Sequence, residues 1–321
     1  MAQPLLQVKN LRTYFIGRQS TVKAVDGVDF EVGRGKVLGI VGESGSGKSM
    51  TSLSVMRLVP APQGRIVEGE ILLDGRDLTK LSEKQMTDVR GNEIGMIFQE
   101  PMSALNPVLK IGEQIGEVLI RHRKLSKSQA RAKAISLLKS VGFPRAEQVV
   151  NEYPHQLSGG MRQRAMIAMA MACEPKLLIA DEPTTALDVT IQAQVLDLMR
   201  SLKENSGTAI ILVTHDLGVV AEMADDVAVM YGGQVVESGS ADEIFDQPLH
   251  PYTRALMESI PVIDQDRERL YAIPGNVPSA ANFPVGCRFA DRCTLVQDKC
   301  REAMPELRSM SPGHSVRCIL A

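Results

Sequence analysis

The chain has 321 residues, of which 44% are hydrophobic and 23% charged, and its formal net charge is −2. This length suits one large domain or two, and the hydrophobic fraction is enough for a substantial core. The charge is close to neutral, which argues against a nucleic-acid-binding protein that relies on a global basic field.

The start of the chain and its apolar runs exclude two kinds of membrane segment. The first 15 residues, MAQPLLQVKNLRTYF, contain Lys9 and lack an apolar core, so we expect no secretory signal peptide. The longest apolar run, 165–173, is far shorter than the ~20 residues that span a bilayer. We therefore expect a cytosolic protein, which would contact a membrane only through partners.

The order of the apolar patterns predicts an α/β fold. Three short runs lack alternation, which is typical of strands covered on both faces of a parallel sheet. They are 36–42, 177–181 and 209–215. Three further segments alternate more and contain glycine turns, so they predict antiparallel strands and a hairpin: 25–33, 69–75 and 227–239. Helices are predicted over 48–58, 112–122, 127–141, 160–172, 189–205 and 217–224. A mostly helical block over about 100–170 interrupts the α/β pattern.

The segment GESGSGKS at 42–49 follows an apolar strand and opens a helix, as a phosphate-binding P-loop requires. Its glycines allow backbone N–H groups to point at phosphate oxygens, and the helix N-terminus adds partial positive charge. Lys48 supplies a charge for the β- and γ-phosphates, and Ser49 a hydroxyl ligand for Mg²⁺. The nucleotide is expected to contact Gly42, Glu43, Ser44, Gly45, Ser46, Gly47, Lys48, Ser49 and Met50. The alternative is a glycine-rich turn without a ligand.

Two carboxylates follow the next apolar strand, at LLIADE. Ligands of open α/β sheets bind beyond the carboxyl ends of the strands, so Asp181 is placed to hold Mg²⁺. Glu182 reaches further and can polarise the attacking water as a general base. The alternative is a helix N-cap before PTTALD, which the P-loop makes less favoured. His215 ends the following strand and is expected to contact the γ-phosphate or the water; a lone histidine there is otherwise structural.

Residues 157–164, LSGGMRQR, form a second candidate anion site. The Ser158 hydroxyl and the N–H groups of Gly159 and Gly160 stand at the start of a predicted helix. The chain thus has two candidate phosphate-binding segments, 42–49 and 157–164, but only one group of candidate catalytic residues. This suggests that the segment 157–164 binds the nucleotide held on the P-loop of another molecule.

In this order, these motifs resemble the nucleotide-binding subunit of an ATP-binding cassette (ABC) transporter over about residues 5–250. LSGG-x-x-Q-R is the distinguishing element, since P-loop proteins at large lack it. The resemblance implies an ABC-type P-loop ATPase domain over 1–250, with a mixed sheet core, an antiparallel β subdomain and a helical subdomain. It also implies a head-to-tail dimer that closes on two ATP molecules.

The resemblance also assigns roles to single residues. Glu182 corresponds to the catalytic base, His215 to the switch histidine, and Gln99 to the loop glutamine that senses Mg²⁺ and the water. The signature that reaches ATP across the dimer comprises Leu157, Ser158, Gly159, Gly160 and Gln163, and the cross-dimer loop comprises Ala186, Leu187 and Asp188. An aromatic near the N-terminus stacks on adenine in this family; spacing favours Phe15 over Tyr14.

Four of the five cysteines lie in the last 35 residues: Cys287, Cys293, Cys300 and Cys318. In a reducing compartment such a cluster indicates metal ligation more than disulfides. Their spacing is looser than most structural zinc sites and leaves zinc, an iron–sulfur cluster and unligated thiols all open. Cys173 stands apart on an apolar helix and is predicted to be a buried core thiol.

The tail, HPYTRALMESIP followed by GCRFADRC, resembles the C-terminal region of dipeptide and oligopeptide importer ATPases. This resemblance implies that residues 251–321 form a small C-terminal region whose four cysteines hold a structural [4Fe–4S] cluster. It implies ATP-driven import of di- or oligopeptides at the cytoplasmic face of the inner membrane. The implied partners are a second ABC ATPase subunit, two transmembrane permease subunits and, indirectly, an extracytoplasmic peptide-binding protein. Two alternatives are a nickel or other small-solute importer and an ABC ATPase acting on nucleic acid or ribosomes.

Overall fold

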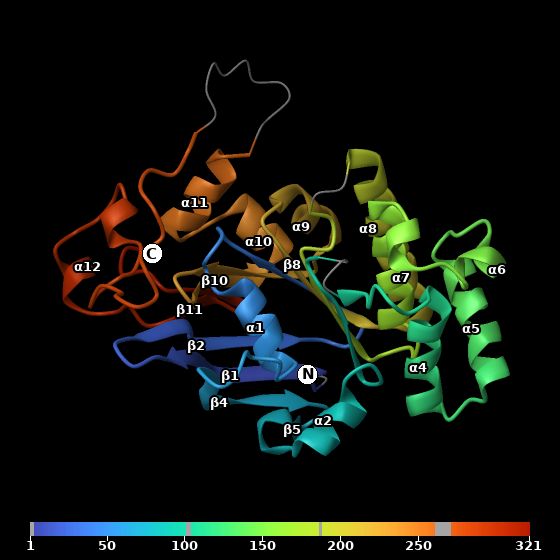
Figure 1. The fold of residues 1–321 in the computed structure, drawn as a ribbon. Coiled ribbons are helices and arrows are strands. Elements are labelled where there is room, and N and C mark those ends of the chain that lie inside the picture. The colour runs from blue at the N-terminus through green and yellow to red at the C-terminus, as the bar shows by residue number, and fades with distance from the viewer. Residues whose placement is uncertain (1–2, 101–103, 186–187, 261–270) are drawn as a thin grey trace.

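The computed structural model describes residues 3–100, 104–185, 188–260 and 271–321. Two sheets occupy the middle of the molecule (Figure 1). A lobe that contains α4, α5, α6 and α7 stands on one side of them, and the cysteine-bearing segment around α12 stands on the other. The expected α/β class with a helical block is confirmed.

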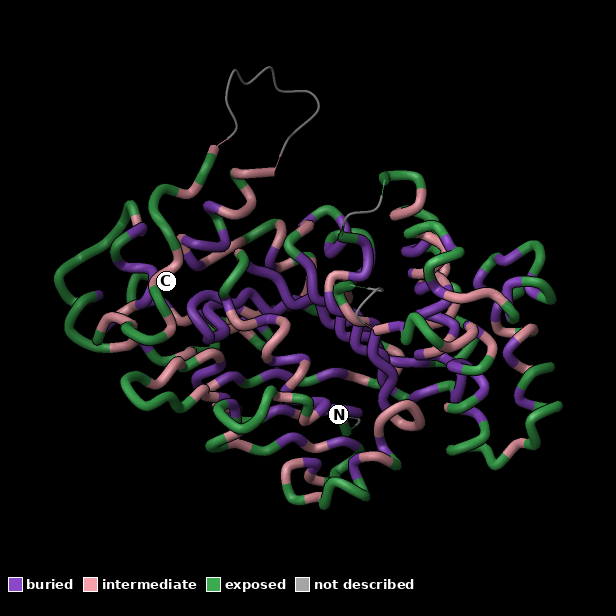
Figure 2. The backbone as a smooth tube through the Cα atoms, in the orientation of Figure 1, coloured by how far each residue is buried: buried purple, intermediate pink, exposed green. Residues whose placement is uncertain are grey.

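The larger sheet has eight strands in the order β11-β12-β10-β9-β3-β8-β7-β6. Its five consecutive strands from β9 to β6 pair in parallel. Every residue of β3, β7 and β8 is buried, as their non-alternating sequences predict, and these strands run through the buried centre of Figure 2. The strands are β3 (Val37–Val41), β6 (Ile94–Ile97), β7 (Leu177–Asp181), β8 (Ala209–Thr214), β9 (Asp226–Tyr231), β10 (Gln234–Ser240), β11 (Arg308–Ser311) and β12 (His314–Val316).

The smaller sheet is antiparallel, with the order β2-β1-β4-β5. It consists of β1 (Leu6–Ile16), β2 (Thr21–Val32), β4 (Gly64–Leu73) and β5 (Arg76–Asp77). Residues of β1 alternate between buried and half-buried over much of its length, so one face packs on the core. The predicted antiparallel strands at 25–33 and 69–75 lie within or overlap β2 and β4; β1 was not predicted.

The helices follow the predicted ranges closely, because several begin at serine or aspartate N-caps. Ser126 caps α5 with Gln129 in a capping box, and Asp188 caps α8. The helices are α1 (Lys48–Val55), α2 (Glu83–Val89), α4 (Ile111–Arg123), α5 (Lys127–Ser140), α6 (Ala146–Val149), α7 (Gly159–Ala170), α8 (Val189–Ser206), α9 (Leu217–Met223), α10 (Ala241–Asp246), α11 (Pro251–Glu258) and α12 (Lys299–Glu302). Short 3-10 helices cover Leu78–Lys80, Pro154–Gln156 and Ala290–Arg292. Of the helices described, none combines the length and apolar character needed to cross a bilayer.

The end of the chain joins the larger sheet. β12 pairs with β10 through Glu237 opposite Val316 and Ser238 opposite Ser315. Beneath this edge, Glu237 is fully buried and its Oε1 lies 2.8 Å from Nε2 of His314. The division of the chain near residue 250 stays a prediction, since the C-terminal region shares a sheet with the residues before it.

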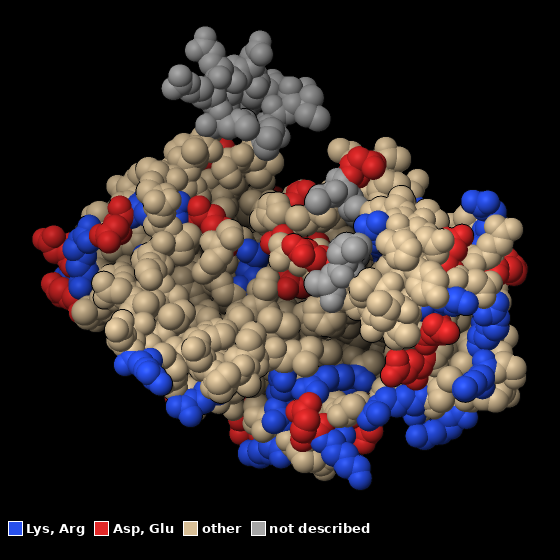
Figure 3. Space-filling model, in the orientation of Figure 1, with Lys and Arg blue, Asp and Glu red and all other residues tan. Residues whose placement is uncertain are grey.

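Charge on the face drawn in Figure 3 is mixed. Acidic side chains gather near the centre of this face, in the region of β8 and α9, and lysine and arginine lie along the edge near α2 and on the helical lobe. Neither sign covers the face as a whole, in keeping with the net charge of −2.

Candidate functional site

The P-loop joins β3 to α1, and two of its glycines are required by the backbone. Gly42 has φ 149°, and a Cβ there would lie 2.2 Å from the carbonyl oxygen of Met230. Gly47 has φ 102°, and a Cβ there would lie 2.5 Å from the carbonyl oxygen of Ala24. Any other residue would be strained and would displace backbone at both positions. A Cβ on Gly45 would meet no described atom within 4 Å, so the loop is open at its tip.

The side chain of Lys48 lies inside this loop. Its Nζ donates hydrogen bonds to the carbonyl oxygens of Gly42, at 2.7 Å, and Glu43, at 3.0 Å. Burial lowers the pKa of Lys48, and the nearby carboxylates of Glu182 and Asp181 counteract that effect. The amine is thus held where phosphate oxygens would replace the two carbonyls as its partners. Of the other predicted loop contacts, Ser44 is exposed, Ser46 buried and Met50 half-buried.

Ser49 and Asp181 form a candidate Mg²⁺ site. The Ser49 Oγ donates a hydrogen bond of 3.0 Å to Oδ1 of Asp181, which is the last residue of β7. Asp181 is 5% exposed, and burial raises its pKa to about 6, with the charge of Glu182 adding to the effect. A buried carboxylate that is costly to ionise, next to a hydroxyl oxygen, is stabilised by a hard divalent cation. The two residues therefore fit Mg²⁺.

Gln99, Glu182 and His215 come together at the carboxyl ends of β6, β7 and β8. Nε2 of Gln99 donates to Oε2 of Glu182 at 3.0 Å, and Nδ1 of His215 lies 3.5 Å from Oε1. Glu182 has φ +48°, a left-handed conformation that costs a non-glycine residue about 1 kcal/mol or more. Such strain is common at functional sites and here aims the carboxylate beyond the strand.

Sequence reasoning missed one member of this group, Thr185. Its Oγ1 donates a hydrogen bond of 2.9 Å to the same Oε2 of Glu182 that Gln99 contacts. In the sequence, Thr185 is marked only by the helix-capping residues of DEPTT, and capping was the alternative to a catalytic role for this segment. Capping and catalysis are compatible here, because the hydroxyl of Thr185 orients the carboxylate of Glu182, three residues earlier in the chain.

The LSGG segment lies at the start of α7, in the helical lobe (Figure 1). The Ser158 Oγ accepts a hydrogen bond of 3.4 Å from the N–H of Met161, and a Cβ on Gly159 would meet no described atom within 4 Å. An open hollow at this helix end is lined by Ser158, Gly159, Gly160 and Asp188, among others. None of its lining residues belongs to the P-loop of the same chain.

Two members of the predicted signature face inward instead. Leu157 is 2% exposed, and Gln163 is 2% exposed with its Nε2 donating a 2.6 Å hydrogen bond to the carbonyl oxygen of Pro183. Gln163 therefore ties α7 to the chain just after Glu182 and does not face the open helix end. Ala186 and Leu187 lie outside the described residues.

The two candidates for stacking on adenine, Tyr14 and Phe15, differ in their contacts within the protein. The Tyr14 hydroxyl donates a 2.6 Å hydrogen bond to Oδ1 of Asp26, which fixes the ring. Phe15 is half-buried and its ring edge lies 2.8 Å from where a Cβ on Gly64 would stand. Tyr14 is thus committed to a polar contact inside the protein, whereas Phe15 is not engaged through a polar group.

The four C-terminal cysteines lie together. All four line one small cavity with residues of the neighbouring loops, and no disulfide joins them. Burial raises the pKa of the Cys287 thiol to about 11, and the other three sulfurs add to the shift. Backbone N–H groups donate to two of the sulfurs, from Gln297 to Cys300 at 3.5 Å and from Leu320 to Cys318 at 3.4 Å. Cys173 is 1% exposed, which confirms the predicted core thiol.

The cysteine arrangement does not fit a single ion. Across the described residues, no group of three or more His, Cys, Asp or Glu side chains is close enough to hold one metal ion. Four thiolates around zinc would stand about 3.8 Å apart, given Zn–S bonds of about 2.3 Å. The four cysteines thus share one cavity without forming a single-ion site.

Comparisons with known proteins agree with this geometry. Residues 25–185 match the family model described as ABC transporter, and residues 236–300 match the one described as oligopeptide/dipeptide transporter, C-terminal region. The chain is 58% identical over 316 residues to the oligopeptide transport ATP-binding protein AppD of Bacillus subtilis, covering 98% of this chain and 96% of that protein. It is 49% identical over 318 residues to the dipeptide transport ATP-binding protein DppD of the same organism, covering 99% and 95%.

Solved structures give the same fold. A dimeric structure of a post-hydrolysis state of the ATP-binding cassette MJ0796, bound to ADP and Pi, superposes with a TM-score of 0.67 at 28% identity. It covers 74% of this chain and 98% of that one. The share left uncovered is consistent with an additional C-terminal region. With its P-loop, its Gln99–Glu182–His215 group and these relatives, the chain is an ATPase that belongs to the ABC transporter family, among the ATP-binding subunits of the oligopeptide/dipeptide type.

Proposed function

We propose that this ATPase powers the import of dipeptides or oligopeptides across a cytoplasmic membrane. The observation that carries the proposal is the presence in one chain of both the ABC cassette and the oligopeptide/dipeptide C-terminal region. Relatives aligned over nearly the whole length are named as oligopeptide and dipeptide transport ATP-binding proteins.

In the proposed reaction, Lys48 binds the β- and γ-phosphates, and the N–H groups of residues 42–50 surround them. Ser49 and Asp181 would hold Mg²⁺ with Gln99, and when bound the ion supplies charge neutralisation of the phosphates. Phe15 stacks on adenine, which the engagement of Tyr14 with Asp26 supports.

Glu182 accepts the proton of the attacking water. Because Gln99 and Thr185 both donate to Oε2, at 3.0 and 2.9 Å, we assign Oε1 as the proton acceptor. His215, whose Nδ1 lies 3.5 Å from Oε1, positions the water and the γ-phosphate. General-base assistance of this kind contributes about 10²–10⁴ in rate.

We propose that a second ABC subunit, a copy or a paralogue, completes each site. Its open α7 N-terminus would face the γ-phosphate, with Ser158, Gly159 and Gly160 as donors and Asp188 beside them. The hollow at this helix end supports the assignment, since it is open and contains no P-loop residue of its own chain. Leu157 and Gln163 would support α7 from within.

The partners of the proposed dimer are two permease subunits in the membrane and, through them, an extracytoplasmic peptide-binding protein. The subunit would sit peripherally on the cytoplasmic face of the inner membrane. The helical subdomain would pass the nucleotide state to the permease, because it connects Gln99 to the LSGG helix.

We further propose that Cys287, Cys293, Cys300 and Cys318 hold a structural [4Fe–4S] cluster. The presence of all four cysteines in the lining of one cavity supports it. Protein purified without oxygen should contain about four iron and four sulfide per chain; one zinc and no iron would overturn the assignment.

Transport itself tests the function. A host strain that lacks this gene should lose uptake of labelled di- and oligopeptides, regained with the wild-type gene but not with Lys48→Ala. Normal peptide uptake with loss of nickel uptake would favour the alternative importer, and unchanged uptake of both would contradict an import role.

A further inference from the structure

The P-loop is held by a residue from the far end of the chain, Arg292. Its Nη1 and Nη2 donate to Oε2 and Oε1 of Glu43 at 2.7 and 2.9 Å, a two-pronged ion pair across 249 residues of sequence. The Arg292 side chain is 5% exposed and that of Glu43 is 32% exposed. Two parallel charge-assisted bonds fix both the position and the orientation of the carboxylate.

Arg292 is itself held rigidly. Its Nε donates to the carbonyl oxygen of Pro274 at 2.8 Å, and its guanidinium carbon lies 5.7 Å from the ring centroid of Tyr231. The hydrogen bond to Glu43 is the main cause of a raised pKa for Arg292. A second tie reaches the same loop residue, since the N–H of Glu43 donates to the buried hydroxyl of Tyr252 at 2.8 Å.

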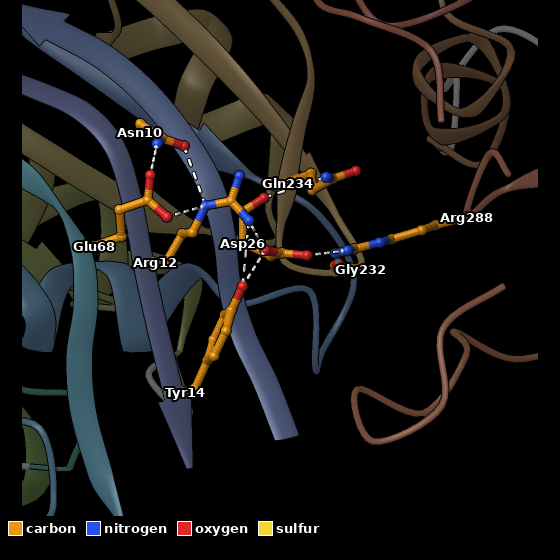
Figure 4. A network of polar contacts seen from close by, with 8 residues as sticks. All are labelled: Asn10, Arg12, Tyr14, Asp26, Glu68, Gly232, Gln234 and Arg288. Atoms are coloured by element: carbon orange, nitrogen blue, oxygen red, sulfur yellow. Dashed lines mark hydrogen bonds and ion pairs between the residues drawn. The ribbon is translucent and has the colours of Figure 1, made fainter. Parts of the chain in front are cut away.

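A second arginine, Arg288, is linked to the P-loop indirectly, through Gly232 and Gly233. Arg288 donates to the carbonyl oxygen of Gly232, and the N–H of the adjoining Gly233 donates to the carbonyl oxygen of Ser46 at 2.8 Å. Arg288 also forms an ion pair with Oδ2 of Asp26, and the hydroxyl of Tyr14 donates a hydrogen bond to Oδ1 of the same carboxylate (Figure 4). The same buried network thus links the P-loop to the strand that bears the adenine candidates.

Two cysteines of the four-cysteine cavity flank the two arginines. Arg288 follows Cys287 and Arg292 precedes Cys293, so a turn of seven residues carries two sulfurs and both ties. A change in the packing of these sulfurs would move Arg288 and Arg292, since each adjoins a cysteine in the chain.

Glu43 also poses an electrostatic problem for the loop. Its carboxylate sits on the segment that receives a triphosphate, and like charges within a few ångströms repel strongly where water is partly excluded. Arg292 compensates this charge and draws the carboxylate toward the C-terminal region.

We propose that Arg292 is a positioning residue for ATP binding, assisted by Arg288, and that the four-cysteine region must be folded for the P-loop to keep its affinity. The proposal rests on the ATPase activity of the family and adds a role for residues beyond the cassette. ATP affinity then depends on the C-terminal region, whereas the rate at saturating ATP does not.

The test uses the full-length protein, a fluorescent ATP analogue for equilibrium binding, and steady-state hydrolysis. Arg292→Gln should weaken binding and raise KM about tenfold with kcat nearly unchanged, and Arg292→Lys should recover part of the loss. Glu43→Gln should cost less, about threefold, and the double variant should match Glu43→Gln alone, since no uncompensated carboxylate remains. Arg301→Gln is the matched control, because Arg301 pairs with Asp291 on the surface of the same region.

Hydrogen exchange of residues 42–49 reports the loop directly. It should rise in Arg292→Gln and in Cys318→Ser but not in Arg301→Gln. If Arg292→Gln is not recovered folded, Glu43→Gln and Cys318→Ser carry the same test. Wild-type affinity in Arg292→Gln, effects that multiply in the double variant, or unchanged exchange in Cys318→Ser would overturn the proposal. Failure of the wild-type protein to bind ATP would instead contradict the proposed function.

Discussion

Gln99 and Glu182 are 83 residues apart, yet Nε2 of Gln99 donates a 3.0 Å hydrogen bond to Oε2 of Glu182. The parallel pairing of β6 with β7 produces this contact, since both residues follow the carboxyl ends of adjoining strands. Gln99 immediately precedes the helical block and orients the carboxylate of Glu182, so a movement of that block would change the position of the carboxylate.

The first prediction concerns this carboxylate. Glu182→Gln keeps the shape and most hydrogen bonds of the side chain but cannot accept a proton, so kcat should fall about 10²–10⁴-fold while ATP binding persists. A stable ATP-bound dimer, or a heterodimer with a partner subunit, should accumulate on size exclusion. Glu204→Gln, an exposed position on α8, is the control. Hydrolysis at the wild-type rate would remove Glu182 as the base.

The second prediction concerns Thr185. Thr185→Val removes the 2.9 Å hydrogen bond to Glu182 and retains the volume, so kcat should drop about tenfold with the ATP dissociation constant unchanged. Thr185→Ser should restore most of the rate, because it restores the hydroxyl. Loss of binding in Thr185→Val, or a Ser variant as slow as Val, would contradict an orienting role.

Local patterns sufficed to predict much of the fold. The covered strands β3, β7 and β8 were found because each is a short apolar run without alternation, and most of the longer helices because they have a helical period and clear end signals. The position of the P-loop followed from the order of strand, loop and helix, and that of Asp181 from its place at the end of a strand. Glu182 and His215 were expected at the site from their places at the strand ends, and Gln99 from the family resemblance; the sheet order accounts for all three.

Long-range pairing was beyond reach of the sequence. β12 is three residues long and joins β10 by two residue pairs, so no periodicity marks it. The contact of Arg292 with Glu43 spans 249 residues and depends on how an irregular segment packs. Single charged residues in loops carry no signal of their partners, which is why both P-loop ties were missed.

The third prediction concerns the cysteine site. Cys287→Ser should remove iron and sulfide from anaerobically purified protein and lower its melting temperature, since the four sulfurs crosslink a segment with little core of its own. Iron chelation of the wild-type protein should act the same way. Cys173→Ser is the matched control: its thiol is buried in the helical core, so iron content should stay the same. Equal iron in both variants would refute the assignment.

The last prediction concerns acid stability through Asp26. Burial alone would raise the pKa of this carboxyl, but hydrogen bonds from Tyr14 and Arg288 outweigh burial and lower the pKa below its usual 3.8. A lowered folded-state pKa means that the stabilisation is complete above about pH 4 and is lost as the pH falls further.

Asp26→Asn leaves the nearly buried Arg288 without its carboxylate, which typically costs about 3–5 kcal/mol at neutral pH. The stability gap between wild type and Asp26→Asn should be constant from pH 7 to pH 5 and should narrow below about pH 4, as the wild-type carboxyl becomes protonated. Thermal or urea unfolding across that range measures it. Asp29→Asn, at an exposed position on the same strand, should differ little from wild type at every pH. A gap that stays constant down to pH 3 would mean that folding does not lower the pKa of Asp26.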